Sequence, residues 1–177
     1  MDHPADIDHD HPAGHGFIRT VSGLWVHLLE PDLTGLPLQD VATALSHVNR
    51  FGGHTPAPYS VAEHSIHVAT QLWRMFGDDE LAAAGLFHDA TEAFLGDMVR
   101  PLKNALPEYR VLEARMEEAV ADRFRLNLLH DPRVKEVDLA ILGWEMPMVR
   151  DADWRTPTPP ATVAQAFLKA ARRYGVR

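Results

Sequence analysis

Apolar residues recur at helical spacing along most of this chain, which predicts a mainly helical protein. The first predicted helix covers residues 38–51 and ends before Gly52 and Gly53, because paired glycines commonly terminate helices. The second begins at Ser60, which forms a capping-box pattern with Glu63. Further helices are predicted over residues 79–96, 108–124, 134–145 and 161–174.

The pattern differs near the N-terminus. Two β-prone runs flank Ser22 and Gly23 within residues 17–29 and predict a β-hairpin. Residues 1–16 are rich in His and Asp with almost nothing apolar, which predicts a disordered tail and a poor catalytic site. The expected fold class is therefore all-α, a helical bundle with a small N-terminal β-hairpin, in which residues 17–177 form a single domain.

Polar side chains lie on the apolar faces of three predicted helices. His64 falls on the apolar stripe of the second helix, whereas His67 points away from it. His88 and Glu92 share the buried face of the third helix, with Asp89 beside His88, and Asp138 lies on the inward face of residues 134–145. The neighbours expected on these faces are Val61, Val68, Leu72 and Met75 for His64, and Val134, Val137, Ile141 and Glu145 for Asp138.

Burying these groups without partners would cost several kcal/mol each. Taken singly, each is most simply a hydrogen-bonded or salt-bridged core residue. Taken together, two imidazoles and two carboxylates on buried faces favour a bound divalent cation, and this ligand set suits Mn, Co, Ni, Fe, Zn or Mg.

Composition narrows the classes of function. The 177 residues carry a net charge of −8, which argues against binding a nucleic acid polymer, because that would require a basic surface. With no cysteine, the chain has no disulfides and no cysteine nucleophile. No apolar run approaches membrane-spanning length and no signal peptide opens the chain, so we expect no membrane association and a cytoplasmic location.

Four segments of the chain together carry a resemblance to a known family: NRFGGHTPAPYSVAEHS, FHDATEAFLGD, RPLK and VKEVD. Their order of His, then His-Asp, then a distant Asp resembles the HD superfamily of metal-dependent phosphohydrolases. Within that superfamily the chain is most similar to bacterial and phage HD-type 5′-deoxynucleotidases, in particular short prophage-encoded members. The likeness runs from about residue 17 to 145, and the tail and last helix carry little of it.

The resemblance assigns roles to individual residues. It implies one divalent metal ion held by four ligands, with two acidic residues near the attacking water. Four further residues would contact the substrate, although Lys103 and Lys135 could also be solvated charges at helix ends. The implied metal ligands are His64, His88, Asp89 and Asp138; the catalytic acids are Glu92 and Asp97; the substrate-binding residues are Arg50, His54, Lys103 and Lys135. Apart from the resemblance, Phe51 is a candidate to bind the substrate by lining the nucleobase pocket, and it is equally credible as core or loop packing.

The chemistry of phosphomonoester hydrolysis agrees with these roles, since it needs an activated water, a base and cations for the phosphoryl oxygens. We expect removal of phosphate from deoxynucleoside 5′-monophosphates. The alternative is a triphosphohydrolase that prefers dATP and releases tripolyphosphate, and a further alternative is a non-catalytic HD module that senses a nucleotide or metal. Because related proteins assemble as dimers or larger rings, a homo-oligomer acting on a small-molecule nucleotide is expected.

Overall fold

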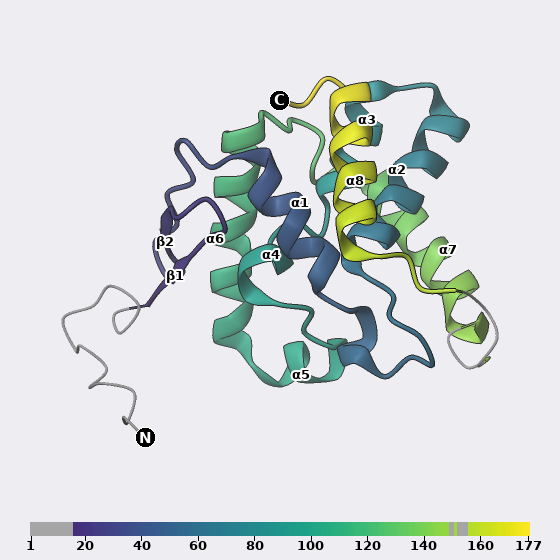
Figure 1. Cartoon of the computed structure of the whole chain (residues 1–177), viewed down its shortest axis with the longest axis horizontal. Coiled ribbons are helices and arrows are strands. Elements are labelled where there is room, and N and C mark those ends of the chain that lie inside the picture. The colour runs from purple at the N-terminus through teal and green to yellow at the C-terminus, as the bar shows by residue number, and fades with distance from the viewer. Residues whose placement is uncertain (1–15, 149–150, 152–155) are drawn as a thin grey trace.

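The computed structural model describes residues 16–148, 151 and 156–177. Helices make up most of this part of the chain, with a two-stranded hairpin at one side (Figure 1). The predicted fold class, all-α with a small N-terminal β-hairpin, is confirmed. The predicted tail over residues 1–16 lies outside the described residues except for Gly16.

The hairpin joins β1 (Phe17–Arg19) to β2 (Trp25–His27) in antiparallel register. The carbonyl of Gly16 accepts a hydrogen bond from the amide of Leu28 at 2.8 Å, so Gly16 belongs to the hairpin and not to the tail. Beyond the hairpin, the chain enters the helices that build the core.

A large apolar core lies between α1 (Leu38–His47), α6 (Pro107–Phe124) and α8 (Pro160–Arg173), and it includes the C-terminal half of α3 (Asp79–Phe87). Phe87 lies at its centre. The Phe87 ring stands 4.9 Å from that of Phe124 and 5.5 Å from that of Phe167, centroid to centroid. Edge-to-face and tilted contacts at such distances are favourable, so this side of the molecule is stabilised by packing.

The first helix ends four residues earlier than predicted. Val48 is extended, with φ −79° and ψ 119°. Asn49 then forms a β-bridge with Ser60, and the chain continues as the short 3₁₀ turn η2 (Arg50–Gly53). The bridge removes Arg50 from the helix and directs it toward the site described below.

Helices α2 (Val61–Phe76) and α3 (Asp79–Phe87) pack closely against each other. The predicted capping box of Ser60 and Glu63 is present at the start of α2. Gly85 permits the approach of the two helices, because a Cβ there would lie 2.2 Å from a methyl group of Leu72. The stripe on α2 ends one turn earlier than predicted, since Met75 is 55% exposed.

The predicted helix over residues 79–96 is interrupted. After α3, the amides of Ala90 and Glu92 bond to carbonyls three residues back, and helical bonding resumes in the single turn α4 (Glu92–Leu95). This tightened turn carries His88 and Asp89. A short α5 (Arg100–Ala105) and α7 (Pro132–Met148) complete the walls of the site.

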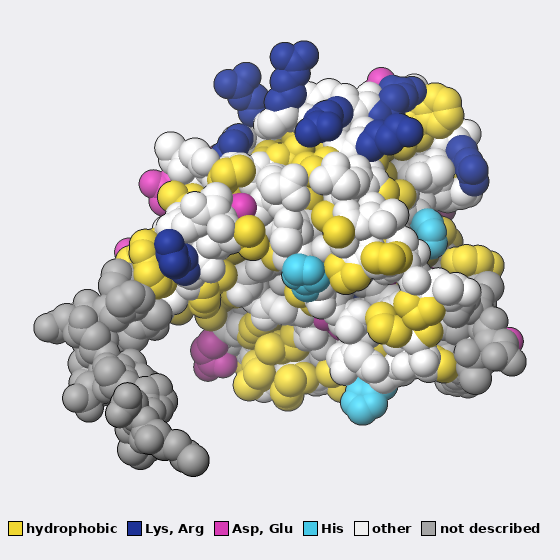
Figure 2. Space-filling view, in the orientation of Figure 1, with side chains coloured by type: hydrophobic (Ala, Val, Ile, Leu, Met, Phe, Trp, Pro, Cys, Tyr) yellow, Lys and Arg dark blue, Asp and Glu magenta, His cyan; other side chains and the backbone are white. Residues whose placement is uncertain are grey.

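Charge is unevenly distributed over the surface. Figure 2 shows Lys and Arg side chains gathered at the end of the molecule where α3 and α8 lie, with few acidic side chains on that face despite the net charge of −8. Within the described part of the chain, no helix combines the length and the apolar character needed to cross a bilayer.

Candidate metal centre and adjoining cavity

Two histidines, the fully buried His64 and the partly buried His88, face each other beneath the surface. His64 on α2 and His88 after α3 bring their Nε2 atoms to 3.3 Å. The Nδ1 of His64 lies 2.8 Å from a carboxylate oxygen of Glu145, and the Nδ1 of His88 lies 2.8 Å from the carbonyl oxygen of Gly85. Because both oxygens accept hydrogen bonds, the Nδ1 of each histidine carries a proton. The two Nε2 atoms point toward the same position between the rings, and that position favours a positive charge.

Two carboxylates complete this cluster. Asp138 on α7 places Oδ1 3.2 Å from His64 Nε2 and 3.6 Å from His88 Nε2. Asp89 places Oδ2 3.2 Å from His88 Nε2 and 3.8 Å from His64 Nε2. Ligands at the usual 2.0–2.2 Å from a divalent ion stand about 2.8–3.6 Å apart, so the donor atoms of His64, His88 and Asp138 fit one ion. The structure therefore brings His64, His88 and Asp138 around one point, and the fourth predicted ligand, Asp89, lies beside the two histidines.

The shifted pKa values of the residues in the cluster also indicate a site that favours positive charge. Burial alone would raise the pKa of Asp89 and Asp138 and lower that of His88. The opposite charges outweigh burial: the pKa of each aspartate falls well below its ordinary value, and that of His88 rises to about 10. A divalent cation held at this point would satisfy the same carboxylates.

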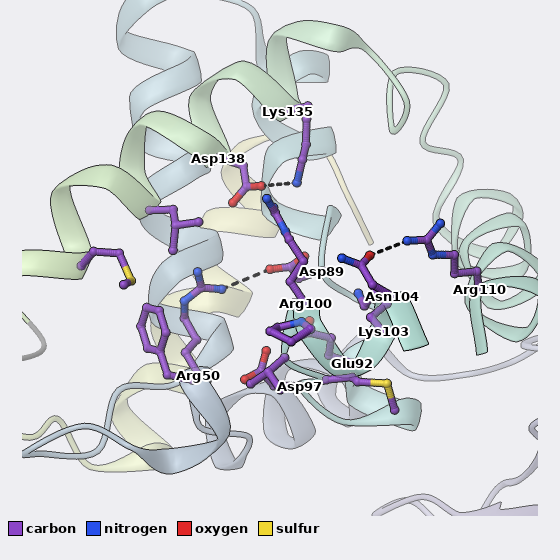
Figure 3. Close-up of a pocket in the computed structure, with 16 residues that line it drawn as sticks. Arg50, Asp89, Glu92, Asp97, Arg100, Lys103, Asn104, Arg110, Lys135 and Asp138 are labelled. Atoms are coloured by element: carbon purple, nitrogen blue, oxygen red, sulfur yellow. Dashed lines mark hydrogen bonds and ion pairs between the residues drawn. The ribbon is translucent and has the colours of Figure 1, made fainter. Parts of the chain in front are cut away.

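Glu92 and Asp97 lie in the wall of a cavity beside the cluster (Figure 3). Glu92 is the first residue of α4 and only 6% exposed, and its Oε2 has no hydrogen-bond partner among the described residues. Burial, together with the charges of Asp89 and Asp97, raises the pKa of Glu92 to about 9. Asp97 accepts a hydrogen bond from the amide of Gly52 at 3.1 Å.

Arg50 is buried between the cluster and α7. Its Nη1 lies 3.4 Å from Asp89 Oδ2, and its Nη2 lies 3.2 Å from Glu145 Oε2. Its Nε finds no partner in the described part of the chain. The guanidinium stands 5.3 Å from the ring centroid of Phe51, whose backbone is left-handed with φ 59°. Arg50 and Phe51 both line the cavity.

The two predicted lysines line the cavity from opposite helices, but each is already paired. Lys135 Nζ lies 2.6 Å from Asp138 Oδ2, and its side chain is 61% exposed. Lys103 donates to Glu113 on α6. His54 is exposed and is not among the residues that line the cavity, so the structure does not bring it to the other predicted residues.

The cavity has a volume of about 580 Å³, within the range of about 300–1,000 Å³ typical of small-molecule sites. Figure 3 shows Arg50 on one side of it and Arg110, bonded to Asn104, on the other. Sequence reasoning missed Arg100, Asn104 and Arg110, because exposed polar side chains near a helix end carry no distinguishing pattern. The apolar part of the lining consists of Phe51, Met98, Val99, Pro101, Leu142 and Met146.

Sequence reasoning also gave no role to Glu145, which is completely buried. This carboxylate contacts both His64 and Arg50, and it accepts a further hydrogen bond from the hydroxyl of Tyr59 at 2.5 Å. A signal was present in the sequence: Glu145 follows Asp138 by two helical turns, on a face that is otherwise apolar.

Comparison with known proteins agrees with this geometry. Over residues 39–137 the chain matches the family described as 5′-deoxynucleotidase YfbR-like. The chain belongs to this family. It is 33% identical over 129 residues to the uncharacterized protein YfdR of Escherichia coli, and the aligned region covers 73% of this chain and 70% of that protein. It is 36% identical over 121 residues to an uncharacterized protein of Rhodobacter capsulatus, and the aligned region covers 61% of this chain and 58% of that protein.

The YfbR-like family consists of HD-domain hydrolases, so the predicted resemblance to HD-type 5′-deoxynucleotidases is confirmed. The buried His and Asp cluster that could hold a metal ion accords with membership of this family. The family and the cluster together support a metal-binding phosphohydrolase.

Proposed function

We propose that this protein is a metal-dependent phosphohydrolase that removes phosphate from deoxynucleoside 5′-monophosphates. One observation carries the proposal: two imidazole Nε2 atoms 3.3 Å apart face the carboxylates of Asp89 and Asp138, and both carboxylates also line a cavity of nucleotide size. A substrate in that cavity would meet the proposed metal centre directly.

We propose that one divalent ion, held by His64, His88, Asp89 and Asp138, would polarise a phosphoryl oxygen and make a bound water acidic. Glu92 is the base for that water, since its Oε2 is buried, unpaired within the described residues and part of the cavity wall. Burial and the charge of Asp89 raise the pKa of Glu92 in the metal-free protein, and a cation bound beside Asp89 would lower that pKa again, toward the ionised form that a base requires. Asp97 contributes to that raised pKa through its charge.

Arg50 is the principal phosphate-binding residue in this proposal. Its contact with Asp89 fixes the guanidinium beside a ligand of the ion, and its unpaired Nε–H is a donor for an equatorial oxygen. Lys103 and Lys135 add positive charge from α5 and α7 without direct anchoring of the phosphate. His54 has no role in this scheme, since it does not line the cavity.

The nucleoside would occupy the apolar part of the cavity. Phe51 offers an aromatic face to a base, and its neighbour Arg50 holds the phosphate, so base and phosphate contacts come from consecutive residues. The volume of about 580 Å³ accommodates a nucleotide.

A triphosphohydrolase that acts on dATP is the second candidate. The observation that favours it is the set of cations beyond Arg50: Arg100, Lys103 and Arg110 line the same cavity and could neutralise additional phosphates. The products separate the two reactions, because a triphosphohydrolase releases tripolyphosphate and a nucleotidase releases orthophosphate.

We also propose that the chain forms a homo-oligomer. Helix α7 exposes two large apolar side chains that do not line the cavity, Leu139 at 44% and Trp144 at 52% exposure. Exposed large apolar side chains of this kind are candidates for an interface. Light scattering of the purified protein measures the assembly directly, and a mass of one chain at all concentrations would contradict it.

The test of the proposed function is product analysis. Purified protein is incubated with dAMP, AMP, dADP and dATP, each with Mn²⁺, Co²⁺, Mg²⁺ or a chelator. We expect orthophosphate from dAMP in the presence of a metal and none with chelator. Tripolyphosphate from dATP would establish the second candidate instead, and no product with any metal would make the binding-module alternative the correct one.

A further inference from the structure

Glu145 is the most completely enclosed carboxylate of the site. It is 0% exposed, and three side chains from three separate segments donate to it. His64 on α2 and Tyr59 ahead of that helix both bond to Oε1, at 2.8 and 2.5 Å, while Arg50 in η2 bonds to Oε2 at 3.2 Å. The two oxygens therefore divide their partners between the metal centre and the phosphate-binding arginine.

Packing alone does not explain a carboxylate in this place. Both oxygens of Glu145 are occupied by polar partners and no part of the side chain reaches solvent. A buried ion pair is often no more stabilising than apolar side chains of the same volume. Since an apolar residue would serve α7 equally well, the charge at Glu145 indicates a role in the site.

The contact with His64 decides which ring nitrogen faces the proposed metal. A carboxylate can only accept, so the Nδ1 of His64 carries the proton and Nε2 remains available to the cluster. A carboxylate behind a metal-binding histidine also makes the ring a stronger ligand and fixes its orientation. Without Glu145, His64 could adopt the other tautomer and would lose the group that orients it.

The contact with Arg50 fixes the guanidinium from its second side. Asp89 holds Nη1, and Glu145 holds Nη2, so the planar group is aligned at both ends. This alignment matters because η2 is a single turn that includes Phe51 and Gly52, both with positive φ. The short turn offers little support to a long side chain, and the two ion pairs supply it.

We propose that Glu145 is a positioning residue that couples the two halves of the site. One oxygen sets the tautomer of His64, and the other sets the orientation of Arg50. The second part rests on the proposed function, because it gives Arg50 the substrate phosphate. The first part concerns metal affinity alone and does not depend on which phosphate ester is hydrolysed.

The test is Glu145→Gln in the full-length protein. Glutamine keeps the volume and can still accept from Tyr59 or His64, but its amide presents a donor to Arg50 and its charge is lost. We expect the Mn²⁺ affinity of metal-free protein, measured by calorimetry, to fall about 10- to 100-fold. The KM for dAMP should rise by a larger factor than kcat falls. Glu136→Gln, an exposed residue on the same helix, is the matched control and should change neither quantity.

Two outcomes would overturn the proposal. The first is a folded Glu145→Gln protein with wild-type Mn²⁺ affinity and wild-type KM. The second comes from wild-type protein labelled with ¹⁵N in its histidine rings, which needs no variant to fold: a Zn²⁺-loaded protein whose His64 carries its proton on Nε2 contradicts the assigned tautomer. If dAMP is not hydrolysed but the Mn²⁺ affinity falls as expected, the coupling to His64 stands and the proposed function is what fails.

Discussion

Phe87 and His88 are neighbours in the sequence, yet they enter opposite regions of the molecule. Phe87 packs against the rings of Phe124 and Phe167 in a core without charges. His88 faces His64 in a region where charges are buried and held by one another. The apolar region is complete as it stands, whereas the polar region has donor atoms directed at a common point.

The difference between the two regions concerns what each contributes. Buried apolar side chains lower the free energy of the folded state in proportion to the area that they remove from water. Buried charges are costly to desolvate and repay that cost only with good partners. Arg50 Nε and Glu92 Oε2 are buried without partners among the described residues, and both belong to the polar region. We infer that the apolar region supplies stability and the polar region supplies chemistry.

Glu92→Gln should have the largest effect on chemistry and the opposite effect on stability. Loss of a general base typically lowers turnover about 100- to 10,000-fold. Because the pKa of Glu92 is about 9 in the folded protein and near 4.5 when unfolded, ionisation opposes folding increasingly between those pH values. The metal-free variant should therefore be more stable than wild type at neutral pH, on the order of 1–3 kcal/mol.

Urea unfolding of the metal-free proteins at pH 5 and pH 8 measures this effect, and the advantage of the variant should grow with pH. Glu118→Gln, an exposed residue on α6, should show no such growth. A Glu92→Gln protein less stable than wild type at both values would make Glu92 a structural residue.

Phe87→Ala tests the apolar region. Removing a buried aromatic ring from a packed core costs about 3–5 kcal/mol, so the urea midpoint should fall strongly. The Mn²⁺ affinity of the folded protein should stay within a few-fold of wild type, although His88 is the next residue. If the affinity collapses while the protein remains folded, the two regions are not separable and the comparison is wrong.

Gly85→Ala tests the junction of the two regions. Gly85 lies where α2 meets α3, and its carbonyl oxygen accepts a hydrogen bond from the Nδ1 of His88. Helix propensity alone would make alanine stabilising by about 1 kcal/mol. The new Cβ would instead clash with Leu72, and overpacking of this kind typically costs about 1–3 kcal/mol. Thermal unfolding should show a lower melting temperature, and a higher one would mean that the interface yields freely.

The sequence predicted site residues where the buried face of a helix alone identifies them. His64, His88 and Asp138 were found because polar side chains interrupt apolar stripes, Asp89 because it adjoins His88, and Arg50 was assigned through the family resemblance. The ends of helices were less predictable. The periodicity continues past Val48 and past Phe87, but a bridge to Ser60 and a tightened turn end the helices there, and distant or local hydrogen bonds leave no mark on the pattern.

Glu145 could be placed on an inward face but not given a role. Its partners His64 and Arg50 lie 81 and 95 residues earlier in the chain, and only the tertiary structure brings them together. The cavity residues Arg100 and Arg110 were missed because exposed arginines carry no distinguishing pattern in the sequence. Helix faces can be derived from local spacing, whereas the combination of faces into a site depends on how the helices pack.

Lys135→Met should have the smallest effect. Its ion pair with Asp138 is close, at 2.6 Å, but the side chain is 61% exposed, and exposed pairs contribute about 0–1 kcal/mol. We expect the KM for dAMP to change by less than about fivefold, with kcat nearly unchanged. A loss of turnover comparable to that of Glu92→Gln would move Lys135 into the catalytic machinery.

The most direct test of the central claim is a metal titration that follows binding and hydrolysis in one sample. Protein freed of metal by chelation is titrated with Mn²⁺, while calorimetry records binding and phosphate release from dAMP records activity. We predict that both rise together and saturate at one ion per chain, and that Asp138→Asn abolishes both. Hydrolysis that persists without metal, or Mn²⁺ binding that Asp138→Asn leaves unchanged, would contradict the assignment of the cluster as the metal centre.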